Sequence, residues 1–286
     1  MSDQHTPKPH ASDIFGFDAF SPREIALRVE TIGVAKAHIP FPSQAMLGIL
    51  AGAFIGLGAL CSNMVFSDDS IGFSASRILG GLAFSLGLML VTVAGAELFT
   101  GNNLLAMAWA AGRLSTLSVL RNWAIVCAAN LIGAVGLAVL VAYSGHLSMN
   151  DGAVGVSAVK IAAAKCSLPF ATAFVRGILC NLLVCMAVWM ALAGRSVVDK
   201  VIAIVPPVTA FVAAGFEHSI ANMYIVPLGW LAAARDPALR AIPGAEAITP
   251  INFAANLVPV ILGNLVGGSV LVALVYWIIY LRPEKA

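Results

Sequence analysis

Two short segments of the sequence resemble each other and carry the acidic residues that lie deepest in apolar surroundings. Residues 95–103 read GAELFTGNN and residues 215–223 read GFEHSIANM, which aligns Glu97 with Glu217. Ionisable groups inside long apolar stretches are costly to bury and are usually functional. Because the two glutamates occupy equivalent positions, we favour a structural role, in which each carboxylate accepts hydrogen bonds from broken backbone. A role along a solute path is the alternative.

A histidine in the second segment has no counterpart in the first. His218 aligns with Leu98, and it is the one histidine of the five that lies deep in an apolar stretch. An architectural residue is expected in both segments, whereas a residue with a chemical role need occur only once. Imidazole donates and accepts hydrogen bonds and titrates near neutral pH. We therefore predict that His218 contacts a solute.

Further polar residues are candidates for contacts along the same path. Thr100 and Asn181 would supply a hydroxyl and an amide group along the path, or would bond neighbouring helices instead. Lys165 would attract anions at an entrance, or would be a solvated lysine in a loop. Asn102 and Asn222 occupy equivalent positions in the two segments. Because asparagine is a favoured cap at helix N-termini, we predict that both cap the helices that follow.

The cysteines and histidines lack the spacing of a metal site. The sequence has five cysteines, an odd number, and no pair has zinc-type spacing with histidines nearby. Haem ligation by paired histidines would need a second histidine inside an apolar stretch, and the sequence has none. We therefore expect no metal, no cofactor and no enzymatic activity.

Long apolar stretches must position these residues. Hydrophobic residues make up 60% of the chain and charged residues 10%, whereas soluble domains carry about 25% charged residues. The net charge of +2 gives no indication of a nucleic-acid partner. We predict an all-α integral membrane protein whose helices cross a lipid bilayer, which takes ~20 residues per span. The six predicted spans are 44–64, 78–98, 120–143, 168–192, 201–216 and 253–280.

The second and fifth spans are predicted to be broken helices. Each reaches one of the two polar segments and then resumes as a short apolar piece, at 104–111 and 224–234. The chain thus divides into two repeats of three spans, 41–144 and 165–283, and an odd number of spans inverts the second repeat.

Inverted repeats with broken helices place the solute site of transport proteins at the breaks. Asn130 and Asn264 align in the third and sixth spans and support the repeat. Unwound backbone at membrane depth is tolerated only inside protein or along a cavity. The pattern therefore predicts a narrow pore for a small solute.

The chain begins with a polar segment, residues 1–40, ahead of the channel domain, residues 41–283. Ser21 and Glu24, with a proline between them, predict a helix start. The helix would lie on the membrane surface or cover the pore mouth. Basic residues are more numerous on the side of the N-terminus, so the positive-inside rule predicts that both termini are cytoplasmic.

With these motifs in place, the chain resembles the formate/nitrite transporter family, and within it the formate channels. The resemblance covers about residues 20–283. It implies an aquaporin-like fold, a homopentamer with one pore in each subunit, and a bacterial-type plasma (inner) membrane. Its most specific motifs are GFEHSIANM at 215–223, ELFT at 97–100, NLLVCMAVWM at 181–190 and YWIIYLR at 276–282.

The resemblance also implies roles for particular residues. His218 corresponds to the central histidine of the family and Thr100 to the threonine that faces it. Asn181 corresponds to the polar residue of the fourth span, and Lys165 to the outer lysine. The apolar constrictions of the family fall on Phe84, Val184 and Phe211 towards the outside, and on Leu88 and Leu98 towards the cytoplasm.

The resemblance implies a small monovalent anion as the solute. Formate is the first candidate, with protons as a coupled partner through the central histidine; passive flow and proton symport both stay open. The segment ELFTGN at 97–102 looks more like that of nitrite-type members, whereas YIVPLG at 224–229 looks formate-type. A nitrite or hydrosulfide channel of the same family is therefore the alternative.

Overall fold

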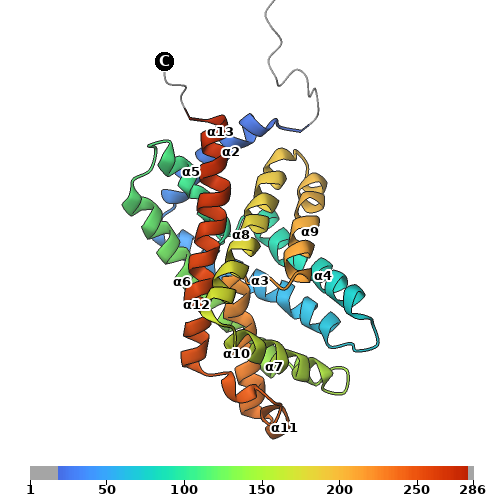
Figure 1. Cartoon of the computed structure of the whole chain (residues 1–286). Coiled ribbons are helices and arrows are strands. Elements are labelled where there is room, and N and C mark those ends of the chain that lie inside the picture. The colour runs from blue at the N-terminus through green and yellow to red at the C-terminus, as the bar shows by residue number, and fades with distance from the viewer. Residues whose placement is uncertain (1–18, 283–286) are drawn as a thin grey trace, which may run out of the picture.

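The computed structural model describes residues 19–282, and every regular element in that range is helical (Figure 1). The first 18 residues of the predicted N-terminal segment lie outside the described residues. In chain order the elements are α2 Pro22–Ala37, α3 Phe41–Phe66, α4 Phe73–Ala94, η1 Gly101–Leu104, α5 Leu105–Ala110, α6 Thr116–Tyr143, η2 His146–Ser148, α7 Ala153–Cys166, α8 Phe170–Ala193, α9 Val197–Ala213, α10 Ser219–Arg235, α11 Pro237–Arg240, η3 Ala245–Ala247, α12 Pro250–Leu265, η4 Val266–Leu274 and α13 Val275–Tyr280.

Within residues 19–282, five helical stretches are long and apolar enough to cross a membrane. They are α3, α4, α6, α8 and the continuous stretch Pro250–Tyr280 that joins α12, η4 and α13. The fifth predicted span coincides with α9, which has 17 residues. The all-α membrane fold is thus confirmed, while the count of six spans stays a prediction.

Both predicted helix breaks are present. Helix α4 ends at Ala94, where Gly95 has a φ of 79°, and the chain becomes helical again at Gly101. Helix α9 ends in the same way before Gly215, which has a φ of 73°, and α10 follows. A positive φ favours glycine because a Cβ would strain the backbone there, and this explains the glycine that opens each polar segment.

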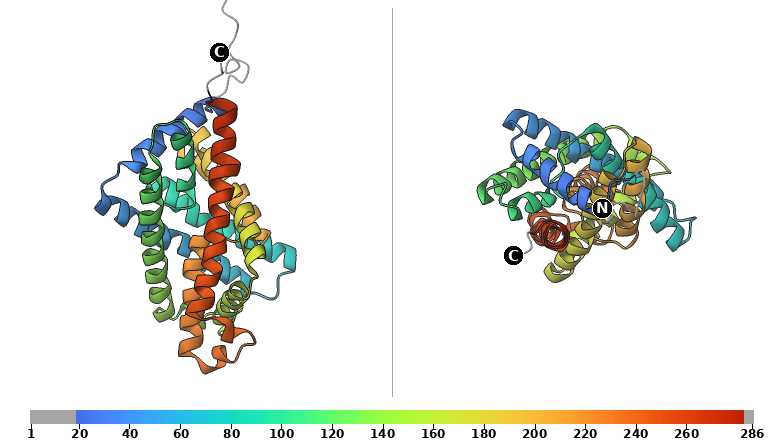
Figure 2. Two further views of the ribbon diagram at one scale, coloured as in Figure 1. Left: turned by 60° about the vertical axis from the view of Figure 1, so that its left-hand side comes forward. Right: turned by 90° about the horizontal axis from the view of Figure 1, so that it is seen from above.

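The two halves of the chain have the same internal packing. Helix α3 packs against α4 and α6, and α8 packs against α9 and α12 in the corresponding way. Helix α2 packs on α5, the second part of the first broken helix, as α7 packs on α10. Figures 1 and 2 place α2 and α7 at opposite ends of the molecule, so the second half is inverted. Each half therefore begins with a short helix that supports the break.

Glycines allow the closest helix contacts. A side chain at Gly133 of α6 would collide with the carbonyl oxygen of Ile49 in α3. In the second half, a side chain at Gly263 of α12 would collide with the carbonyl oxygen of Phe174 in α8. Small residues let membrane helices approach closely, and here they hold the unbroken helices around the breaks.

The last helix departs from regular α-helical geometry in one place. Residues Val266–Leu274 form a π-helical stretch, in which Ser269 donates from Oγ to the carbonyl oxygen of Asn103 at 3.1 Å. Wider turns of this kind often occur at functional sites. The sequence pattern did not predict this stretch, which lies against the first break.

Candidate functional site

Two cavities enter the molecule from opposite ends. The larger, about 560 Å³, is lined by residues of α3, α4, α7, α9 and α10 and is called the α7 cavity. The smaller, about 210 Å³, is lined by residues of α2, α4 and the first break and is called the α2 cavity. Helix α2, with Val29, Gly33 and Lys36 on this wall, therefore borders a cavity mouth.

The five residues that the sequence predicted as apolar constrictions are buried, and we call them the apolar layer. Phe84 and Phe211 line the α7 cavity, and their rings meet edge to face with centroids 5.6 Å apart. Leu88 and Leu98 line the α2 cavity. Val184 is fully buried and lines neither cavity. All five of these residues are at most 4% exposed.

His218 lies at the inner end of the α7 cavity, beneath the ring of Phe211. The two rings are stacked with centroids 5.9 Å apart. His218 is also the N-cap of α10, because its Nδ1 accepts a hydrogen bond from the backbone N–H of Ala221 at 3.1 Å. A nitrogen that accepts cannot carry a hydrogen. The hydrogen of the neutral ring therefore lies on Nε2.

Nε2 of His218 faces Thr100, with 3.1 Å between it and Oγ1. Since the ring nitrogen donates, the threonine oxygen accepts, and its own hydroxyl hydrogen is left to donate elsewhere. The pair joins the two breaks, because Thr100 ends the first and His218 ends the second. The geometry thus brings together two residues that the sequence predicted as solute contacts.

Asn181 lies behind Thr100. Its Nδ2 donates to the side-chain oxygen of Asn103 at 2.7 Å, to the carbonyl oxygen of Asn264 at 2.7 Å and to that of Thr100 at 3.3 Å. Asn181 is fully buried and lines neither cavity. Its amide nitrogen therefore holds the first break against α8 and α12.

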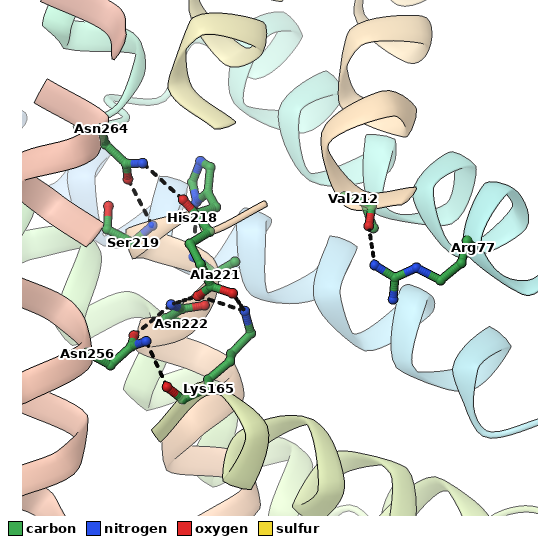
Figure 3. A network of polar contacts seen from close by, with 10 residues as sticks. Arg77, Lys165, Val212, His218, Ser219, Ala221, Asn222, Asn256 and Asn264 are labelled. Atoms are coloured by element: carbon green, nitrogen blue, oxygen red, sulfur yellow. Dashed lines mark hydrogen bonds and ion pairs between the residues drawn. The ribbon is translucent and has the colours of Figure 1, made fainter. Parts of the chain in front are cut away.

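Lys165 reaches the second break from the end of α7 (Figure 3). Its Nζ lies 2.9 Å from Oε1 of Glu217 and 3.1 Å from Oε2. Asn222 donates to Oε2 of the same carboxylate at 2.6 Å and to Oδ1 of Asn256 at 2.8 Å. Asn256 in turn donates to the carbonyl oxygen of Lys165 at 2.9 Å. The lysine is thus held by both its side chain and its backbone.

The first break has the same network. Nζ of Lys36 lies 2.8 Å from Oε1 of Glu97. Asn102 donates to Oε2 of Glu97 at 2.7 Å and to Oδ1 of Asn122 at 3.0 Å. Asn122 donates to the carbonyl oxygen of Lys36 at 3.3 Å. Lys36 is therefore the counterpart of Lys165, and each cavity has one lysine paired with one buried glutamate.

Two details of the predicted network are wrong. Asn102 and Asn222 do not cap helices, because His218 is the N-cap of α10 and Thr100 precedes η1. The glutamate carboxylates bind lysine and asparagine side chains and not backbone amides. The physical reason is that the lysine charge is the stronger partner for a buried carboxylate.

Asn130 and Asn264 tie down the broken backbone instead. Oδ1 of Asn130 accepts from the backbone N–H of Phe99 at 2.9 Å, and Oδ1 of Asn264 accepts from that of Ser219 at 3.0 Å. Their Nδ2 atoms donate to the carbonyl oxygens of Glu97 and Glu217, at 2.9 Å and 3.0 Å. Figure 3 shows Asn264 beside Ser219 and His218. The repeat alignment had identified this pair without a role.

Arg77 is a further residue that the sequence did not single out. From α4 it donates to the carbonyl oxygens of Val212 at 2.7 Å and Ala213 at 3.0 Å (Figure 3). These are among the last carbonyls of α9, which have no helical partner. Arg77 therefore clamps the end of α9 just beyond Phe211.

The chain matches known proteins along most of its length. A family model described as formate/nitrite transporter matches residues 23–278. The formate channel FocA of Escherichia coli (strain K12) is 38% identical over 281 residues, which cover 94% of this chain and 97% of FocA. A solved structure described as a pentameric formate channel with formate bound has a TM-score of 0.78 at 38% identity, covering 85% of this chain and 98% of that one. Another, described as an FNT family ion channel, has a TM-score of 0.79 at 29% identity, covering 91% of this chain and 99% of that one.

Proposed function

This chain belongs to the formate/nitrite transporter family, and on that premise we propose that it is a membrane pore for formate. The observation that carries the proposal is a pair of cavities, one lined by Phe84, Phe211 and His218 and the other by Leu88 and Leu98, together with the hydrogen bond between His218 and Thr100 that joins the two breaks. The naming of FocA and of the solved pentamer as formate channels supports formate as the solute.

The apolar layer sets the form in which formate crosses. Moving a bare carboxylate into an apolar medium costs tens of kcal/mol in the idealised limit. Protonating an acid with a pKa near 4 at pH 7 costs about 4 kcal/mol. The neutral acid is therefore the cheaper species between Phe84 and Phe211 on one side and Leu88 and Leu98 on the other.

We propose that Lys165 concentrates the anion in the α7 cavity and that His218 supplies or relays a proton near the layer. Thr100, whose hydroxyl hydrogen is not used by His218, orients the solute. Protonating the ring at Nδ1 would end the bond from Ala221, so each relay cycle would loosen the cap of α10.

A histidine that only hydrogen-bonds the solute is the second candidate, and the cap favours it. With Nδ1 held by Ala221, the neutral ring donates from Nε2 and needs no change of protonation. In that case protons come from water in the cavity, and His218 stabilises the passing solute.

Replacing His218 by Asn separates the two candidates. Asparagine keeps the ability to cap a helix and loses the titratable ring. If His218 relays the proton, labelled formate flux into liposomes, measured from pH 5 to pH 7.5, is expected to lose most of its pH dependence in His218→Asn. The matched control is His146→Asn, which lies in η2 away from the path. Unchanged pH dependence in His218→Asn would exclude a proton relay by His218 and would leave the hydrogen-bonding role.

We also propose a homopentamer whose α7 cavity faces outside and whose α2 cavity faces the cytoplasm, with both termini cytoplasmic. The description of the related solved structure as pentameric supports the assembly, and the distribution of basic residues supports the orientation. Mass measurement in detergent tests the assembly. Labelling a cysteine at His146, in a variant without the five native cysteines, in intact cells tests the orientation, since η2 packs against α7.

Nitrite or hydrosulfide remains the alternative solute. The segment ELFTGN at 97–102 supports it, and the two solutes differ from formate in shape and acidity. Competition against labelled formate discriminates between them.

A further inference from the structure

Arg77 joins the two helices that carry the phenylalanine rings of the α7 cavity. From α4, its Nε donates to the carbonyl oxygen of Ala213 and its Nη2 to that of Val212, and these two hydrogen bonds are called the clamp. Phe84 lies on α4 as well, and Phe211 directly precedes Val212 on α9. We propose that Arg77 is a positioning residue, which sets the separation of the two rings and thereby the size of the solute that passes them. This inference rests on the proposed function, in which a small acid passes the rings.

The ring of Phe211 depends on the last turn of α9. That helix ends at Ala213, and the non-helical second break follows. The last carbonyls of a helix lack partners in the next turn, and helix ends fray. The ring centroid of Phe211 is 5.6 Å from that of Phe84 and 5.9 Å from that of His218. A group that fixes this turn therefore fixes the ring at the wall of the cavity.

Helices α4 and α9 pack along one seam that contains both the clamp and the rings. Gly81 lies one turn after Arg77 on α4, and a Cβ there would lie 2.7 Å from the carbonyl oxygen of Thr209. Phe84 follows Gly81 by three residues and so lies on the same face of α4. Since α4 is held closely at Gly81, loss of the clamp would release the end of α9 and let Phe211 move relative to Phe84.

The guanidinium group of Arg77 is held in place by its neighbours. Its central carbon lies 5.1 Å from the ring centroid of Phe66, at the end of α3. Gly215 leaves room on the other side, because a Cβ there would lie 3.2 Å from Nη2. A planar guanidinium donates in fixed directions to two acceptors at once, whereas the ammonium group of lysine does not. The two successive carbonyls therefore require arginine.

The clamp occurs in one half of the chain only. The repeat alignment, carried back along both helices without a gap, pairs Arg77 with Val197. A valine side chain cannot donate a hydrogen bond, and Val197 is 57% exposed. The two phenylalanines also lack aromatic counterparts, since the equivalent residues are Ile204 and Val91. Residues that occur in both halves support the breaks, so a clamp that accompanies the rings in one half points to a role at the rings.

The flux of labelled acetate relative to that of labelled formate, measured in liposomes, tests the clamp. Arg77→Met removes the clamp, and Arg77→Lys removes it but keeps the positive charge. Both are expected to raise the ratio of acetate to formate flux about 5-fold or more, since one methylene unit in a fitted apolar site is worth roughly 10- to 200-fold. Lys160→Met is the matched control. It removes a positive charge from the lining of the same cavity on α7 and should leave the ratio unchanged.

A double variant separates positioning of the ring from general damage to the fold. Phe211→Leu should itself raise the ratio, and adding Arg77→Met should then change it by less than about twofold, because the ring to be positioned is gone. A wild-type ratio in both Arg77 variants would overturn the proposal. So would a wild-type ratio in Arg77→Lys alone, which would assign the effect to the charge, or an equal effect of Arg77→Met with and without the ring of Phe211.

Failure of the clamp is distinguishable from failure of the proposed solute. If the wild type carries nitrite and not formate, formate is wrong as the solute, and the ratio is measured between nitrite and the larger nitrate. A higher ratio of nitrate to nitrite flux in both Arg77 variants would still support the clamp. An unchanged ratio would overturn it.

Discussion

At the scale of single residues, the two lysine–glutamate pairs are equivalent in contact but not in burial. The side chain of Lys165 is 14% exposed and that of Lys36 is 28% exposed, whereas the paired carboxylates are 4% exposed in both cases. A buried charge without a counter-ion is strongly unfavourable. Loss of the lysine is therefore expected to destabilise the more deeply buried pair, Lys165 and Glu217, more than the other pair. Lys165 therefore has a structural task besides attracting anions.

Lys165→Met is expected to lower the free energy of unfolding by about 3 kcal/mol, because it leaves Glu217 buried and unpaired. Lys165→Met/Glu217→Gln should recover most of the loss, since the carboxylate charge is removed as well. Thermal unfolding in detergent measures both, with Lys36→Met as the matched control that should cost less. Equal unfolding temperatures for the single and double variants would contradict the pairing.

Glu24 makes the start of α2 sensitive to acid. The side chain of Ser21, and then its backbone N–H, hydrogen-bond the carboxylate and lower the pKa of Glu24 below its ordinary 4.5. A lowered folded pKa stabilises the helix start fully above the ordinary value, and this contribution is lost as pH falls through the folded pKa. Hydrogen exchange of the first turn of α2 should be faster in Glu24→Gln than in the wild type at pH 7, with the difference shrinking below pH 4.5. A difference that does not change with pH would exclude the charge as its cause.

At the scale of elements, helix contact depends on glycines that differ in their surroundings. Gly133 and Gly136 lie one turn apart on α6, but only Gly133 faces the backbone of α3. A side chain at Gly136 would meet nothing within 4 Å. The two positions therefore separate the effect of close helix packing from that of helix propensity.

Gly133→Ala is expected to reduce the yield of folded protein strongly, because the new methyl group must displace the carbonyl of Ile49. Gly136→Ala should be neutral or stabilise by up to about 1 kcal/mol, since alanine is the better helix former. Size-exclusion profiles and unfolding temperatures of the two variants provide the measurement. Similar behaviour of both variants would show that α3 and α6 tolerate a wider separation.

The sequence predicted the elements better than their partners. The breaks could be predicted because glycine and acidic residues interrupt apolar runs at two matching places. Lys36 could not be paired with Glu97, because the contact spans α2 and the first break and has no local signal. The cap formed by His218 was also missed, since histidine is not among the favoured N-cap residues. The π-helical stretch in the last helix, from which Ser269 hydrogen-bonds Asn103, has no signal in the periodicity of the sequence.

At the scale of the whole molecule, the two inverted halves share the residues that support the breaks but differ in the residues between the breaks. Both halves supply a lysine, a glutamate and a set of asparagines, so each cavity is supported in the same way. Between the two breaks, the second half supplies His218 and the first supplies the facing threonine. The residues that occur in both halves therefore hold the breaks. His218 and Thr100 each occur in one half only, and they are the groups that we propose contact the solute.

The flux of labelled formate into liposomes that contain the purified protein tests whether this pore carries formate. It is measured at pH 5 and pH 7.5, with excess nitrite as competitor and empty liposomes as the control. We expect rapid formate entry that is faster at pH 5 and persists in the presence of nitrite. Slow formate entry together with rapid nitrite or hydrosulfide entry would contradict formate as the solute of this pore.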